Sequence, residues 1–197
     1  MRKTIIHPLW LRLTHWINVV AILVMITSGW QIYDASPVFH AIRFPDAITL
    51  GGWLGGALLW HFAFMWLLAG NLLVYGLVNL CSGRLRRKMF PLSPRMVLHD
   101  LCAALRGRQS RHDPAHYNAV QKLAYLAVLA DLVLLILSGL AVWKSVQFPL
   151  LRELMGGYDN TRVVHFCAMA FLVLFLLVHL AMVALVPRSL RAIIQGH

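Results

Sequence analysis

Four long stretches of the chain consist almost entirely of apolar residues, and the polar positions concentrate in the segments between them. A helix needs roughly 20 apolar residues to cross the hydrocarbon core of a bilayer, and each stretch is at least that long. The pattern therefore predicts four membrane-spanning helices. Their expected bounds are residues 13–33, 50–80, 119–143 and 162–186.

The second span is unusually long, and the first contains polar and aromatic residues. The second is 31 residues long, but two spans joined by a turn would need more than about 40 residues, so we expect one tilted helix that protrudes into water. The first is interrupted by His15, Trp16 and Asn18 and is followed by no small-residue cleavage site. It is therefore expected to be mature structure and not a signal peptide.

A shorter amphipathic helix is predicted in the loop after the second span. Ser93 is placed to cap a helix that starts at Pro94 and ends at Gly107. An apolar stripe on this helix is suited equally to the membrane interface and to packing against the bundle. The stripe consists of Met96, Val97, Leu101, Cys102 and Leu105. The segments 38–52 and 148–160 are expected to be loops with a turn or two of interfacial helix, and no internal repeat is evident.

The composition supports a membrane location. The 197 residues are 60% hydrophobic and 13% charged, with a mean hydropathy of +0.70, which is far more apolar than a usual soluble domain. The predicted fold class is therefore all-α: an integral membrane four-helix bundle, with residues 1–197 forming a single domain.

The net charge of +11 is explained by topology. Fourteen of the 18 Lys and Arg residues lie at the two termini, in the loop 81–118 and at the start of the third span, and the two other loops share the remaining four. The positive-inside rule then places both termini and the Arg-rich loop in the cytoplasm. The run Arg84–Lys88 is expected to contact anionic lipid headgroups, and no nucleic-acid partner is expected.

Four of the ten histidines lie inside the predicted spans, namely His15, His61, His165 and His179. A polar side chain in hydrocarbon is costly, so each is a candidate functional residue. His165 and His179 are fourteen residues apart, which is ~21 Å of helical rise and about 40° short of four turns. They share one helix face at opposite depths. In the predicted topology His61 matches the depth of His165 near the outside, and His15 matches that of His179 near the cytoplasm.

Two facing imidazoles at each of two depths are what bis-histidine haem ligation in a helical bundle requires. A zinc-type site would need three or four ligands, and neither pair is expected to have a third. Interhelical hydrogen bonding is the alternative role.

The chain lacks the C-x-x-C-H motif of covalent c-type haem and the H-E-x-x-H motif of zincin-type proteases. The cysteines Cys81, Cys102 and Cys167 give no information about disulfides.

Other unusual residues lie within the spans. Asp131 is midway along the third span, where an ionised carboxylate is expensive. A proton relay and a neutral hydrogen-bonded contact are both open for it, and Asn71 in the second span has the same two readings. The small residues at the start of the second span are expected to allow close helix approach or to leave room for a flat macrocycle. They are Gly51, Gly52, Gly55, Gly56 and Ala57.

A family resemblance covers essentially the whole chain. The first span and its flanks read "HPLWLRLTHWINVVAILVMITSGWQIYDASP" and resemble the start of the bacterial cytochrome b561 and Ni-Fe hydrogenase b-type cytochrome family. Relatives of this family include formate dehydrogenase gamma subunits and thiosulfate reductase cytochromes b. The similarity continues through "GALLWHF", "HYNAVQKLAY" and the final two-histidine helix. It implies a four-helix dihaem cytochrome of the bacterial inner membrane, with His15 and His179 on the cytoplasmic haem b and His61 and His165 on the external one.

The resemblance also implies a function. Such proteins exchange electrons between the quinone pool, ubiquinone or menaquinone, and a periplasmic redox partner such as a molybdopterin oxidoreductase. Their quinone pocket lies near the cytoplasmic haem, close to an element that corresponds here to Tyr117, Asn118, Gln121 and Lys122. Polar residues at a helix start are often only caps, so this assignment has a structural alternative.

Haem propionates need cationic partners. Arg12, Lys122 and Arg188 are candidates on the cytoplasmic side and Arg162 on the external side, with lipid snorkelling as the alternative for each.

Two other functions stay open, and so does the question of whether the chain is an enzyme or an electron-transfer subunit. One is a stand-alone superoxide:quinone oxidoreductase. The other is haem or ion transport without redox turnover, which would need a polar path through Asp131 and Asn71.

Overall fold

The computed structural model describes residues 7–106 and 118–196, and the regular structure there is helical. Four of its helices are long and apolar enough to cross a membrane. They are α1 (Leu9–Ala35), α2 (Leu54–Cys81), α5 (Ala119–Trp143) and α7 (Tyr158–Leu185). The prediction of an all-α, four-helix membrane bundle is confirmed.

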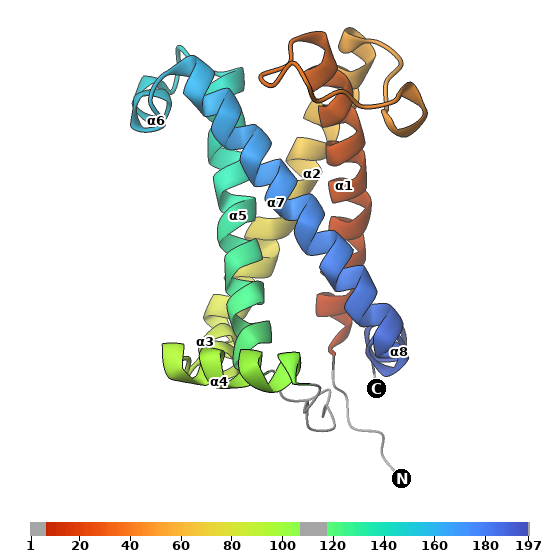
Figure 1. The fold of residues 1–197 in the computed structure, drawn as a ribbon, viewed down its shortest axis with the longest axis vertical. Coiled ribbons are helices and arrows are strands. Elements are labelled where there is room, and N and C mark those ends of the chain that lie inside the picture. The colour runs from red at the N-terminus through yellow and green to blue at the C-terminus, as the bar shows by residue number, and fades with distance from the viewer. Residues whose placement is uncertain (1–6, 107–117, 197) are drawn as a thin grey trace.

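Short elements cover the two ends of the bundle. They are η1 (Asp46–Ile48), α3 (Arg84–Met89), α4 (Pro94–Leu105), α6 (Pro149–Leu154) and α8 (Pro187–Gln195). The first turn of α1 lies at the same end as α3, α4 and α8, while α6 lies at the opposite end (Figure 1). This end includes α3 and α4 from the basic loop, so the positive-inside rule predicts that it is the cytoplasmic end.

Each spanning helix begins and ends within four residues of its predicted bounds. One correction concerns the start of α2, because Gly51 and Gly52 have φ values of 114° and 71° and turn the chain before the helix begins. The Leu50 N–H donates to the Thr27 carbonyl at 3.1 Å, which holds this turn against α1. A Cβ on Gly51 would lie 2.3 Å from the Ala57 nitrogen. Gly51 therefore permits a tight turn, and it does not serve helix packing as predicted.

The cytoplasmic loop contains the predicted amphipathic helix. The Ser93 hydroxyl accepts a hydrogen bond from the Met96 N–H at 3.3 Å, which is the expected N-cap of α4. The predicted C-cap, Gly107, lies outside the described residues. Helices α3 and α8 were not expected, whereas α6 corresponds to the short interfacial helix expected on the external side.

The spanning helices pack as two antiparallel pairs, α1 with α2 and α5 with α7. Helix α7 runs obliquely from the outer end of α5 toward the inner end of α1 (Figure 1). A buried cluster at mid-depth draws on all four helices: Ala21, Ile22, Ile26, Leu68, Val128, Leu132 and Leu172. Leu59, Leu73 and Leu174 are more than half exposed, as expected of side chains that face lipid.

Polar contacts tie the helices together at two levels. The Asn71 side-chain amide donates to the Thr14 carbonyl at 2.7 Å and to Asn18 Oδ1 at 2.6 Å. Asn71 therefore makes an interhelical contact between α1 and α2. At the cytoplasmic end, Arg12 Nε donates to the Ile193 carbonyl at 3.1 Å. This contact satisfies a carbonyl near the end of α8 and joins that end to α1.

Candidate functional site

Two of the four membrane histidines meet toward the cytoplasmic end. His15 on α1 and His179 on α7 have ring centroids 6.4 Å apart and ring planes inclined by 59°. An imidazole nitrogen binds a metal at about 2 Å, so two rings that ligate one ion from opposite sides hold their centroids roughly 6 Å apart. The spacing fits one ion between the rings. Phe175 stacks on His179 with centroids 5.9 Å apart and limits how that ring can turn.

The other two histidines meet toward the external end. His61 on α2 and His165 on α7 lie near enough to interact electrostatically. Each ring also contacts a serine on the neighbouring helix, with Ser28 Oγ 3.0 Å from His61 Nδ1 and Ser138 Oγ 2.8 Å from His165 Nδ1. The structure thus brings together the two histidine pairs expected from their depths.

The serine contacts select the tautomer of the external histidines. Ser28 Oγ donates its single proton to the Val24 carbonyl at 2.6 Å, and Ser138 Oγ donates to the Leu134 carbonyl at 2.7 Å. Each hydroxyl can therefore only accept a hydrogen bond from the imidazole, so Nδ1 carries the ring proton. The lone pair of Nε2 is left for a metal, and the ring is held in one orientation.

A glycine next to each serine makes room for the imidazole. A Cβ on Gly29 would lie 3.4 Å from His61 Cε1, and a Cβ on Gly139 would lie 3.2 Å from His165 Cε1. A Ser-Gly dipeptide on α1 and another on α5 thus each supply a hydrogen-bond acceptor and space for the imidazole of the neighbouring helix. The sequence carries this signal as "TSGW" and "LSGL". The sequence alone does not single it out, because small residues in membrane helices commonly serve helix packing and because no longer repeat surrounds the two motifs.

We expect Gly139→Ala to disturb the external site. The added methyl group would push on the His165 ring, displacing it by tenths of an ångström and weakening its hydrogen bond to Ser138. Changes around a metal-binding histidine typically lower metal affinity by about 10- to 100-fold. Haem content and the absorption spectrum of the reduced protein measure the effect.

Gly70→Ala is the matched control for this variant. A Cβ on Gly70 would meet nothing within 4 Å, and Gly70 lies nine residues from His61, on the opposite face of α2. This control should keep the wild-type haem content and spectrum. Identical spectra for Gly139→Ala and wild type would show that the glycine is not needed to seat the histidine.

The donor groups available narrow the kind of metal that fits. Over residues 7–106 and 118–196, no three His, Cys, Asp or Glu side chains come together. The described side chains therefore do not complete the three- or four-ligand site that zinc prefers. Each histidine pair supplies two nitrogen ligands, which suits an iron whose remaining ligands come from a planar macrocycle, as in haem.

The cytoplasmic site is also suited to the carboxylates that such a macrocycle carries. His7 Nδ1 is buried and has no hydrogen-bond partner among the described residues. Burial and the nearby Arg84 and Lys88 lower the pKa of His7, and Arg12 and His15 lie close enough to add to the effect. This cluster of positive charge beside His15 favours an anionic group. At the external level, the buried Trp30 Nε1 likewise lacks a partner within the described part of the chain.

Comparison with known proteins agrees with these features. The family model for prokaryotic cytochrome b561 matches residues 6–196. The chain belongs to the prokaryotic cytochrome b561 family. It is 60% identical over 192 residues to a protein of Azospira oryzae described as putative protein-methionine-sulfoxide reductase subunit YedZ1, covering 98% of this chain and 96% of the relative. No solved structure matches the chain. Cytochrome b561 proteins bind b-type haem in the membrane, so the predicted family and the type of cofactor are confirmed.

Three of the residues suggested for quinone binding in this cytochrome b561, Asn118, Gln121 and Lys122, lie together at the start of α5. Asn118 Oδ1 accepts from the Gln121 N–H at 2.8 Å, and the Asn118 N–H donates to Gln121 Oε1 at 3.1 Å. These two bonds form a capping box. Lys122 Nζ donates to the Pro91 carbonyl at 3.3 Å. Tyr117 lies outside the described residues.

Helix α4 reinforces the start of α5. Asp100 Oδ2 accepts from the Ala119 N–H at 2.8 Å, which holds α4 against the first turn of α5. This bond, assisted by His99, keeps the pKa of the Asp100 carboxyl below its usual value. The contact therefore contributes its full stability above the ordinary carboxyl range and loses it as the pH falls through the lowered pKa.

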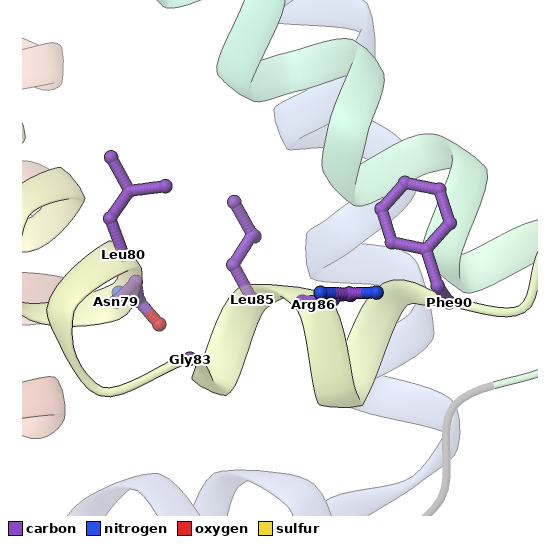
Figure 2. Close-up of a pocket in the computed structure, with 6 residues that line it drawn as sticks. All are labelled: Asn79, Leu80, Gly83, Leu85, Arg86 and Phe90. Carbon is purple, nitrogen blue, oxygen red and sulfur yellow. The ribbon is translucent and has the colours of Figure 1, made fainter.

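A cavity of about 440 Å³ opens at the same end of the bundle. It lies where α2 passes into α3, and Figure 2 shows Leu80, Leu85 and Phe90 projecting to one side of this segment, with Asn79 and Arg86 beside them. The wall is apolar except for an amide and a guanidinium group. Its lining does not include the capping box of α5, so the cavity and the residues suggested for quinone binding are separate features of the cytoplasmic end.

The arginines suggested as propionate partners have contacts within the protein. Arg162 Nη2 donates to the Ser36 carbonyl and lies 3.1 Å from Ser36 Oγ, joining the outer ends of α7 and α1. Arg12 joins α1 to α8 as described above. The side chain of Arg188 lies outside the described part of the structure. Arg12 stays within reach of the cluster around His7, as their electrostatic interaction shows.

Proposed function

We propose that this protein is a dihaem b-type cytochrome of the bacterial inner membrane that carries electrons between the quinone pool and a redox protein on the external side. The two histidine pairs at different depths carry the proposal. Helix α7 contributes one histidine to each pair, and His165 and His179 are separated by ~21 Å of helical rise. That distance covers most of a hydrocarbon core of ~30 Å. A single haem site would not carry electrons over this distance.

In this proposal the histidine pairs His15–His179 and His61–His165 hold one haem each, and the bound haems supply one-electron transfer. Ser28 and Ser138 orient the external ligands. On the cytoplasmic side, His7, Arg12, Arg84 and Lys88 would hold the propionate carboxylates. Arg162 has the corresponding place on the external side. The helices keep bulk water away from the centre of the path.

The external partner is proposed to be a methionine-sulfoxide reductase of the molybdopterin class. The support for the reductase is the relative from Azospira oryzae, which carries the name of a putative protein-methionine-sulfoxide reductase subunit. The molybdopterin class is the one that the family resemblance implies. Reduction of a sulfoxide to a thioether consumes two electrons and two protons and releases water, and oxidation of one quinol supplies two electrons. Electrons would therefore run outward, from quinol at the cytoplasmic end to the partner at the external end.

We place the quinone at the cytoplasmic end, in contact with Asn118 and Lys122 and with Tyr117 and Gln121 nearby. The start of α5 lies at the same end as His15 and His179, and an apolar cavity opens beside it. The side-chain amide of Asn118 makes no hydrogen bond to another described residue, so it can donate to a quinone carbonyl while Oδ1 keeps its cap.

Two substitutions at Asn118 separate quinone binding from capping. Asn118→Ser keeps a capping acceptor but removes the amide donor, whereas Asn118→Ala removes both and costs the helix about 1 kcal/mol. Both variants should keep their haem and be reduced by a quinol analogue much more slowly than wild type in stopped-flow absorption measurements.

The serine variant decides the outcome, because its helix remains capped. Wild-type kinetics in Asn118→Ser would contradict quinone contact at this residue. Asn79→Ala, which alters the wall of the neighbouring cavity, would then be expected to slow the reduction. If no quinol analogue reduces the haem of the wild type, quinol oxidation itself is wrong.

The transport alternative has lost support. It needs a continuous polar path, and one of the two central polar residues, Asn71, is bound to Thr14 and Asn18 between α1 and α2. Uptake of a solute into liposomes without haem reduction would favour it again.

A further inference from the structure

Asp131 is a buried acid that the proposed electron path leaves unused. Its side chain on α5 is only 7% exposed, and Oδ2 is buried with no hydrogen-bond partner among the described residues. A neutral, fully hydrogen-bonded helix contact, one of the two readings of the sequence, is not what the described residues form. An unpartnered polar atom in such surroundings is costly and calls for an explanation.

The helical register places Asp131 between the two histidine levels. Ser138 contacts His165 and fixes the pairing of α5 with α7. Asp131 comes seven residues before Ser138, which is almost two full turns, so both lie on the same face with Asp131 about 10 Å deeper. On α7, buried Leu172 lies midway between His165 and His179. Antiparallel pairing sets Asp131 level with Leu172, halfway between the two proposed haem sites.

The other titratable groups around Asp131 are the histidines of the two pairs and residues at the ends of the bundle. Helix α5 itself has Lys122, Tyr125 and, just after its end, Lys144. The helices packed against it contribute Tyr158, Asp159, Arg162 and Cys167 on α7, Arg95, His99, Asp100 and Cys102 on α4, Arg152 and Glu153 on α6, and Tyr75 and Cys81 on α2. Asp131 is the only Asp or Glu in the central part of the four spans.

We propose that Asp131 is a proton-accepting group coupled to electron arrival at the two haem sites. The inference rests on the proposed dihaem function. A haem with two neutral histidine ligands has one unit of positive charge on its iron–porphyrin core when oxidised and none when reduced. At about 10 Å in a medium of low dielectric constant, loss of this positive charge makes the ionised form of the Asp131 carboxyl group much less stable.

The balance of the step is simple. When one electron from quinol reaches a neighbouring site, the Asp131 carboxylate takes up one proton from water and becomes a carboxylic acid, so the charge added to the apolar interior is neutralised. When the electron leaves toward the external partner, Asp131 releases the proton. The side chain thus makes the midpoint potential of the haems depend on pH, with lower potentials at alkaline pH where the carboxylate must be protonated on reduction.

Spectroscopic redox titration of the purified cytochrome at several pH values tests this proposal. Wild type should show potentials that fall as the pH rises. Asp131→Asn, which stays neutral, should match wild type at acid pH, have higher potentials at alkaline pH and lose this pH dependence. A tenfold difference in proton affinity between oxidised and reduced protein corresponds to about 59 mV for one electron. Glu153→Gln, an exposed external acid paired with Arg152, is the matched control and should behave as wild type.

A second readout keeps the roles of charge and structure apart. The infrared difference spectrum between reduced and oxidised wild type should contain the carbonyl stretch of a newly protonated carboxylic acid, and Asp131→Asn should lack it. An unchanged pH dependence and an unchanged carbonyl signal in a haem-loaded Asp131→Asn variant would overturn the proposal. Absence of haem from the wild type would instead contradict the dihaem function.

Discussion

A His165→Ala variant is expected to lose the external haem and to keep the cytoplasmic one, and His179→Ala should show the reverse. Each histidine belongs to a pair on a different level, so removing one leaves the other pair intact. His61→Ala and His15→Ala should repeat the two patterns. Haem per polypeptide, measured as the pyridine haemochrome, should fall by half in every case, and the absorption spectra of the reduced proteins should fall into two classes.

The control for these variants is His40→Ala, which changes an exposed histidine in an external loop and should keep the full haem content. The four histidine variants also test the pairing. If His165→Ala resembled His15→Ala instead of His61→Ala, the assignment of ligands to levels would be wrong even with the correct number of haems.

The second large effect concerns electron delivery across the membrane. His165→Ala protein in liposomes should still accept electrons from a quinol analogue at its cytoplasmic haem, but transfer to a membrane-impermeant acceptor on the external side should fall to the background rate. The reason is distance, because the remaining site lies ~21 Å along α7 from the missing one. Two measurements on one sample, haem reduction and acceptor reduction, follow the two halves of the path.

His40→Ala again serves as the control and should transfer electrons to the acceptor like wild type. Undiminished transfer in His165→Ala would mean that the external haem does not lie on the path. Loss of both haem reduction and acceptor reduction would place quinone oxidation at the external end instead.

The spanning helices and the pairing of the histidines were predictable because each follows from a strong physical constraint. The thickness of the hydrocarbon core determines the length of an apolar helix, and the distribution of Lys and Arg sets its direction. Once direction is known, a histidine near one end of a span has a defined depth. The structure accordingly brings His15 to His179 and His61 to His165.

The surroundings of the histidines were harder to predict. Ser28 and Ser138 act through hydrogen bonds that depend on how neighbouring helices are rotated and aligned, and one sequence does not specify those variables. Gly51 was misread for a similar reason, since its positive φ becomes visible only when the chain turns back on the first turn of α2. The alternative role of Asn118 as a helix cap is confirmed, since the structure contains a capping box there. This role is predictable because the spacing of Asn and Gln is the one that a capping box requires.

The haem content of the purified wild-type protein tests the central claim most directly. Two histidine pairs on two levels predict two non-covalent haems b per polypeptide, released by acid acetone and quantified as the pyridine haemochrome. A value near two supports a haem at each level. One haem, or none, would contradict the dihaem assignment and leave one or both histidine pairs with a purely structural role in holding the helices together.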